Sequence, residues 1–180
     1  MVVKHKRTIS FRLATVNDIP KLQTIELAAA AIFSDADLNP HLKNQATSIK
    51  AFEESIEQNH CFIITVNDQI AGFCQCGIVD SFWHIFEISI HPDYSRKGFG
   101  KQFLNYVVNR ASDNQFNAVT LTTFEHIPWN GPFYKKNGFE LITENQVLPE
   151  LKKIIKKEKL IGLKNRIAMK RKLPEYVVRE

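Results

Sequence analysis

Residues 86 to 101 read Phe86-Glu87-Ile88-Ser89-Ile90-His91-Pro92-Asp93-Tyr94-Ser95-Arg96-Lys97-Gly98-Phe99-Gly100-Lys101. This order predicts a strand, a turn and a glycine loop that opens onto a helix. Glycines at 98 and 100 let the backbone approach a ligand, and the free N–H groups and dipole of a helix start favour an anion. Basic side chains flank the loop, those of Arg96, Lys97 and Lys101. The segment therefore predicts a cradle for phosphate groups.

Neither common nucleotide fingerprint fits this loop. Gly100-Lys101 lacks the following Ser or Thr and the upstream Gly of a P-loop, and no third Gly follows for a dinucleotide turn. We therefore expect the anion to be neither a nucleoside triphosphate nor a dinucleotide. A tight turn that binds nothing is the alternative explanation of the two glycines.

The flanking sequence predicts further strands and helices around this segment. Alternating or β-branched apolar residues predict strands at 8–14, 61–66, 70–79, 82–90, 118–122, 139–142 and 166–173. Apolar residues at helical spacing predict helices at 18–32, 49–59, 100–111, 128–136 and 148–159. The helix between the strands at 82–90 and 118–122 implies a crossover connection, and hence a parallel pair of strands.

The composition fits one globular domain. The chain has 180 residues, a formal net charge of +5 and 44% apolar residues. With no repeat or linker, we expect one domain over 1–180, with its core at about 8–173 and the helix and strand of 148–173 as part of it. The apolar run Leu27–Phe33 is far shorter than the roughly 20 residues of a membrane span, and the basic N-terminus lacks the pattern of a secretory signal. We expect a cytoplasmic protein with no membrane partner.

The cysteines and histidines predict no metal site. Cys61, Cys74 and Cys76 form no C-x-x-C pair, and Cys74 and Cys76 are expected to share one face of a strand as small core residues. The histidines at 84, 91 and 126 have no ligand spacing.

Two ordered motifs resemble the GNAT acyltransferase superfamily. His91-Pro92 and the loop with Gly98 and Gly100 are similar to its acetyl-CoA loop, Gln/Arg-x-x-Gly-x-Gly/Ala, with Ser95 in the Gln/Arg position. Phe133-Tyr134-Lys135-Lys136-Asn137-Gly138-Phe139 resembles its Phe-Tyr-x-x-x-Gly-Phe segment, and Arg12-Leu13-Ala14-Thr15 resembles its opening strand. The resemblance implies an α/β (α+β) GNAT fold, with a mixed, mostly antiparallel sheet of about six to seven strands, flanking helices and a parallel pair that splays at the acetyl-CoA site.

The resemblance also implies a set of site residues and a reaction. Acetyl-CoA is the expected cofactor and coenzyme A the product, without a metal. Direct acyl transfer to a primary amine in a ternary complex is expected, with a backbone N–H near Ile88 at the oxyanion. The expected cofactor-binding residues are Ile88, Ser89, Ile90, Ser95, Arg96, Lys97, Gly98, Phe99, Gly100, Lys101, Asn130 and Tyr134.

Two residues are candidates for proton transfer. Glu87 is an acid in an otherwise apolar strand, and alternation predicts that it shares a face with Trp83, Ile85 and Ser89, where desolvation would raise its pKa. A solvent-facing glutamate is the alternative, and the resemblance favours a general base. Tyr134 matches the tyrosine that protonates the leaving sulfur in relatives, and the resemblance favours this role over the alternative of a phenol packed at a helix and sheet junction.

The acceptor is less defined by sequence. Phe33, Trp83, Glu87 and Trp129 are candidates for the acceptor site, although such aromatic residues are more often core. The acidic side chains Asp35 and Asp37 of residues 33–37 could attract a cationic amine, and a solvated loop is the alternative interpretation of this segment. We expect a small cationic amine, or a lysine or N-terminal amine of a peptide, as acceptor. Relatives are often homodimers.

The positive charge suggests other functions as well. Residues 151–172 carry a local net charge of +9, and the rest of the chain carries −4. This basic segment suggests a nucleic-acid-binding protein, but it has no aromatic residue for base stacking, which makes nucleic acid an unfavoured partner. A coenzyme A-binding regulatory module without catalysis is a further alternative.

Overall fold

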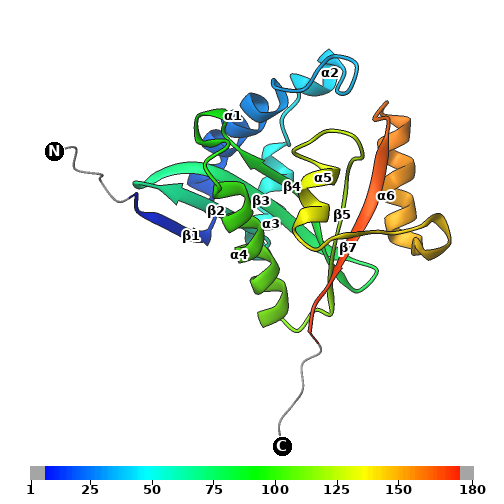
Figure 1. Cartoon of the computed structure of the whole chain (residues 1–180). Coiled ribbons are helices and arrows are strands. Elements are labelled where there is room, and N and C mark those ends of the chain that lie inside the picture. Colours follow the sequence, from blue (N-terminus) through cyan, green and yellow to red (C-terminus); the bar gives the residue numbers. More distant parts are fainter. Residues whose placement is uncertain (1–6, 175–180) are drawn as a thin grey trace, which may run out of the picture.

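The computed structural model describes residues 7 to 174, and its centre is a seven-stranded sheet in the order β1-β2-β3-β4-β5-β7-β6 (Figure 1). All neighbouring strands pair antiparallel except β4 and β5, which are parallel. This arrangement confirms the predicted fold class. The strands are β1 (Ile9–Leu13), β2 (Cys61–Val66), β3 (Gln69–Val79), β4 (Phe82–Ile90), β5 (Ala118–Phe124), β6 (Glu140–Leu141) and β7 (Arg166–Lys172).

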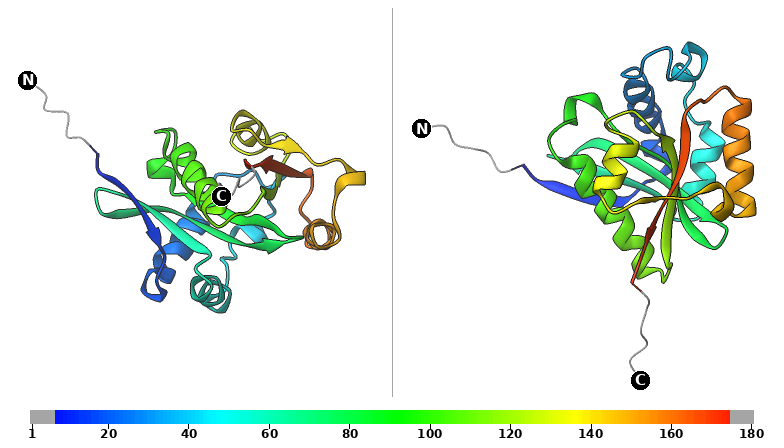
Figure 2. Two further views of the ribbon diagram at one scale, coloured as in Figure 1. Left: turned by 90° about the horizontal axis from the view of Figure 1, so that it is seen from below. Right: turned by 45° about the vertical axis from the view of Figure 1, so that its right-hand side comes forward.

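Helices cover both faces of the sheet. Seen edge-on in Figure 2, α4 and α5 lie on one face, and α1 and α3 lie on the other. Phe103, Leu104 and Val107 of α4 form the main core with apolar residues of the sheet, and Leu22, Ile25 and Phe52 form a second core on the opposite face. The helices are α1 (Ile19–Ala30), α2 (Pro40–Lys43), α3 (Ile49–Glu57), α4 (Phe99–Asp113), α5 (Gly131–Lys136) and α6 (Pro149–Leu160).

Helix α6 is fixed to the sheet by a long-range cap. Both Asp80 carboxylate oxygens accept from its first turn, at 3.0 Å from the Glu150 N–H and 2.8 Å from the Leu151 N–H. Leu151 then packs against Val79 and Ala168. The turn between β3 and β4 therefore determines where the basic C-terminal helix begins.

Local capping explains two of the differences from the predicted elements. Helix α2 interrupts a segment expected to be irregular, because Asn39 caps it by accepting from the Leu42 N–H at 3.0 Å and Pro40 occupies its first turn. Helix α1 is preceded by a 3-10 turn, Val16–Asp18, that Thr15 caps. Helix α5 is shorter than predicted, and the strand predicted at 139–142 shrinks to β6.

The cysteines lie in the core, as predicted. All three are free and buried, and the Cys74 and Cys76 Sγ atoms are 3.5 Å apart on the α4 face. Residues 7–174 contain no group of three or more His, Cys, Asp or Glu side chains placed to hold a metal ion. Within the same residues, no helix has the length and apolar character needed to cross a bilayer.

Candidate active site

Strands β4 and β5 separate in the middle of the sheet. They pair only over Trp83–Ile85 and Val119–Leu121. Beyond these residues, β4 continues beside β3 to Ile90, and β5 continues beside β7 to Phe124. The parallel pair therefore splays, which confirms the expectation and leaves main-chain groups of β4 beyond Ile85 without a partner in β5.

A β-bulge at Phe86 sets the direction of Glu87. The register between β3 and β4 shifts here, so that Phe86 is an extra residue in β4. Glu87 lies directly opposite Gln75, whose amide donates to groups of α3, so Glu87 faces the α1 and α3 side. The expectation that Glu87 shares a face with Trp83 and Ile85 is wrong, because alternation shifts by one residue at the bulge.

The surroundings of Glu87 favour its protonated form. The Ser89 hydroxyl donates to Glu87 Oε1 at 2.6 Å. Burial raises the pKa of Glu87, and this effect exceeds the opposing effects of the Ser89 hydrogen bond and the positive charge of Arg166. Glu87 therefore accepts a proton at a pH closer to neutral than an ordinary carboxylate does.

Sequence reasoning missed a second carboxyl group, Glu26 of α1. Its oxygens accept from the Thr47 N–H and the Thr47 hydroxyl, each at 2.8 Å. Burial, reinforced by the negative charge of Glu87, raises the pKa of Glu26 to about 7. A sequence signal existed, because Glu26 lies four residues after Leu22 and three before Ala29, on the apolar side of the helix.

The start of α4 has the form predicted for an anion cradle. Gly98 adopts a left-handed conformation (φ +82°) and precedes the first helical residue, Phe99. The first helical hydrogen bond runs from the Gln102 N–H to the Gly98 carbonyl, so the N–H groups of residues 99 to 101 take no acceptor within the helix. A Cβ on Gly100 would meet no atom closer than Ile90 Cγ1 at 3.9 Å, so the backbone there is open.

The other predicted cofactor residues surround this loop. Arg96, Lys97 and Lys101 are exposed, whereas the Phe99 side chain is buried and can contribute only its main chain. Ser95 closes a 3-10 turn (Pro92–Tyr94), its N–H donating to the Pro92 carbonyl at 3.0 Å. The last residues of β4 line the separated part of the strand, Ile88 and Ile90 toward the main core and Ser89 toward Glu87.

Tyr134 and Asn130 approach from α5. Gly131 lets this helix start against the end of β5, since a Cβ there would lie 2.5 Å from the Glu125 carbonyl oxygen. Tyr134 is buried, and burial together with the charge of Glu87 raises the pKa of its phenol. The Asn130 amide donates to Thr123 Oγ1 at 3.0 Å, while its Oδ1 is buried and has no hydrogen-bond partner among residues 7–174. An unpaired buried acceptor at this place fits an N–H donor of a ligand.

Two of the three aromatic candidates for the acceptor site lie together. The Phe33 ring centroid is 5.9 Å from that of Trp129 and 5.4 Å from that of Phe124. Beside them, Asp37 Oδ1 is 2.8 Å from His126 Nε2. Trp83 does not join this cluster, because it points to the opposite face of the sheet and packs on Phe62 and Phe116 of the main core.

Comparisons with known proteins place this architecture in a family. Residues 27–139 match the family described as Acetyltransferase (GNAT) family. The curated [Ribosomal protein bS18]-alanine N-acetyltransferase of Escherichia coli strain K12 is 22% identical over 139 residues, which cover 69% of this chain and 88% of that protein.

Solved structures share the same fold. The PaiA N-acetyltransferase of Thermoplasma acidophilum in complex with coenzyme A matches with a TM-score of 0.69 at 15% identity, over 92% of this chain and 99% of that one. The ribosomal-protein-S18-alanine N-acetyltransferase of Escherichia coli matches with a TM-score of 0.69 at 19% identity, over 96% and 99% of the two chains. The chain therefore belongs to the GNAT acetyltransferase family, and it is an acetyl-CoA-dependent N-acetyltransferase.

Proposed function

We propose that this enzyme transfers the acetyl group of acetyl-CoA directly to a primary amine, with Glu87 as general base and Tyr134 as general acid. The observation that carries the proposal is the separation of β4 and β5, where burial and the negative charge of Glu87 raise the pKa of the Tyr134 phenol. Glu87 belongs to the splayed part of β4, and Tyr134 reaches the same region from α5. Catalysis by proton transfer requires both groups near one reaction centre.

The residues around the split fit acetyl-CoA. The N–H groups of residues 99 to 101 and the cations Arg96, Lys97 and Lys101 suit its phosphates. The main chain of Ile88–Ile90 and the unpaired Asn130 Oδ1 suit the amides of its pantetheine arm. When bound there, acetyl-CoA supplies an activated acetyl thioester.

The two titratable groups have pKa values that suit their roles. Glu87 accepts the proton of the amine, which its raised pKa permits near neutral pH. The raised pKa of Tyr134 keeps the phenol protonated, so it has a proton to give to the departing sulfur. A β4 amide near Ile88, free of a β5 partner, donates to the carbonyl oxygen as negative charge develops there.

The charge on the α1 side favours a cationic acceptor. The negative charge of Glu87 disfavours the ionisation of Glu26, so an ammonium ion bound beside them would stabilise the ionised carboxylates. Phe33 and Trp129 supply an aromatic wall and Asp37 a further acid at the same end of the sheet. A small cationic amine, a lysine side chain or a peptide N-terminus meets these requirements, and the name of the Escherichia coli relative adds N-terminal alanine to the amines worth testing.

Two measurements test the proposal. Calorimetric titration with acetyl-CoA should show binding that Gly98→Val abolishes, and binding unaffected by this change would exclude the cofactor site proposed at the start of α4. Release of free thiol should then be measured with polyamines, amino sugars, lysine peptides and peptides with N-terminal alanine. Turnover with one of these classes, lost in the Glu87→Gln variant, supports the proposal. Binding without turnover across the panel would exclude the acceptor classes proposed here.

A further inference from the structure

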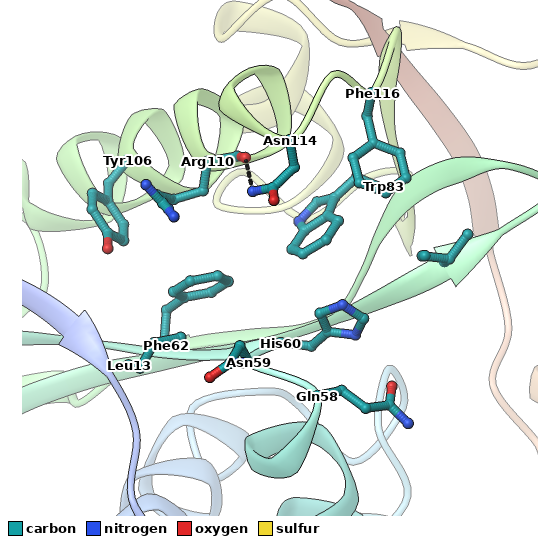
Figure 3. Close-up of a pocket in the computed structure, with 11 residues that line it drawn as sticks. Leu13, Gln58, Asn59, His60, Phe62, Trp83, Tyr106, Arg110, Asn114 and Phe116 are labelled. Carbon is teal, nitrogen blue, oxygen red and sulfur yellow. Dashed lines mark hydrogen bonds between the residues drawn. The ribbon is translucent and has the colours of Figure 1, made fainter.

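A second cavity lies at the other end of α4, away from the anion cradle. Its volume is about 590 Å³, within the usual range of small-molecule sites. It is lined from below by β2, β4 and the segment before β2, and from above by the last turns of α4 (Figure 3). Arg110 on its upper side lies twelve residues beyond Gly98, which corresponds to roughly 18 Å along the helix. The cavity is therefore distinct from the site of acetyl transfer.

Four aromatic side chains contribute to the cavity wall, beside polar side chains that include Gln58, Asn59 and Asn114. Phe62 and Tyr106 meet edge to face with ring centroids 5.9 Å apart, and the Trp83 ring lies 5.1 Å from that of Phe116. In Figure 3, the Trp83 indole extends into the space between the sheet and α4. Walls of this kind suit a flat apolar body, since aromatic pairs gain from stacked and edge contacts.

Two buried polar atoms at this cavity have no hydrogen-bond partner within residues 7–174. They are Trp83 Nε1 and His60 Nδ1. Trp83 is 3% exposed, and its indole N–H is a donor only, so it requires an acceptor. Buried indole N–H groups are usually paired, so this unpaired N–H beside the cavity is available to an acceptor atom of a ligand.

The charges around the cavity indicate which kind of hydrogen-bond acceptor a ligand would carry. Arg110 is the one permanently charged residue among the lining side chains, and no Asp or Glu of the described chain lines the cavity. Arg110 Nη1 also contacts Asp113 Oδ2 at 3.2 Å, on the exposed side of the helix. Burial lowers the pKa of His60, which keeps its ring neutral at physiological pH. Arg110 is thus the lining group that can pair with a negative charge on a ligand.

We propose that this cavity binds a small aromatic monocarboxylate. The aromatic body lies among Phe62, Trp83, Tyr106 and Phe116, and the carboxylate accepts from the Trp83 indole N–H and pairs with Arg110. This site is independent of the acetyl transfer reaction.

The test uses 1-naphthylacetate as the probe and its neutral amide, 1-naphthylacetamide, as the matched ligand control. The chain has two tryptophans, so the Trp129→Phe variant assigns the indole N–H resonance of Trp83. Titration of the full-length protein should shift this resonance, with the acid binding at least about tenfold more tightly than the amide.

Charge variants identify the anion contact. Arg110→Gln should weaken binding of 1-naphthylacetate by about tenfold and leave binding of the amide unchanged. Lys50→Gln, at an exposed position on α3, also removes one positive charge and should change neither the affinity for the acid nor that for the amide. Saturating acetyl-CoA should leave the affinity for the acid unchanged.

Several results would overturn the proposal. One is an unshifted Trp83 resonance at about 10 mM probe, a concentration that detects even millimolar affinity. Equal affinity for the acid and the amide would exclude recognition of the carboxylate, and so would an affinity for the acid that Arg110→Gln does not change. Competition by acetyl-CoA would place the probe in the anion cradle instead.

Discussion

Replacement of Glu26 by glutamine should stabilise the protein at alkaline pH. Glu26 has an ordinary pKa of 4.5 when unfolded, and burial together with Glu87 raises its pKa to about 7 in the folded protein. The folded state therefore holds this proton more tightly than the unfolded state. The stability that comes from the proton is complete below pH 4.5 and is lost as the pH rises through about 7.

The size of the effect follows from the two pKa values. A rise from 4.5 to about 7 corresponds to about 3 kcal/mol of folding free energy once the carboxyl is ionised in both states. Glu26 is partly exposed, and solvent screening reduces the effect to about 2 kcal/mol. Glutamine resembles the protonated carboxyl, because it can accept from the Thr47 N–H and donate to the Thr47 hydroxyl. The variant therefore keeps these contacts and cannot become charged.

Urea unfolding at several pH values measures the prediction. The free energy of unfolding of Glu26→Gln should equal that of the wild type near pH 4.5 and exceed it by about 2 kcal/mol above pH 8. Glu53→Gln, at an exposed position on α3, is the matched control and should show a difference that stays constant with pH. If the advantage of Glu26→Gln does not grow with pH, the electrostatic reasoning is refuted.

Further predictions concern catalysis and the fold. Glu87→Gln should lower kcat by about 10²-fold or more and remove the acidic limb of the pH–rate profile, which the raised pKa of Glu87 displaces toward neutral pH; wild-type kinetics would exclude Glu87 as the base. Tyr134→Phe should slow single-turnover acetyl transfer by about tenfold or more at unchanged acetyl-CoA affinity, whereas an unchanged rate would argue against its role as acid. Asp80→Ala should lower the free energy of unfolding by about 1 to 2 kcal/mol, because α6 loses its cap; thermal denaturation would contradict this if the midpoint stayed the same.

Patterns within short stretches of the chain were sufficient to predict the order of the strands and helices and the conformation of the glycine loop. The 61–66 and 82–90 strands have the predicted boundaries, and α4 starts one residue before the predicted position. Gly98 has the left-handed conformation that a glycine before a helix permits. These features depend on residue spacing and backbone preference, both of which are readable along the chain.

The environment of the proposed catalytic groups was determined by tertiary structure. Period-two alternation places Glu87 beside Trp83, and a single bulge residue, Phe86, reverses that placement. Glu26 gains its raised pKa from burial and from Glu87, which lies far from it in sequence. Trp83 lines a cavity on the opposite face instead of the acceptor site.

The sequence by itself thus determined the family, the sheet-forming segments and the anion loop, because each rests on local spacing. The tertiary structure decided which carboxyl groups interact and which aromatic residues share a pocket. Burial and electrostatic interaction depend on distance in space, and a one-residue change of register is enough to move a side chain from one face of the sheet to the other.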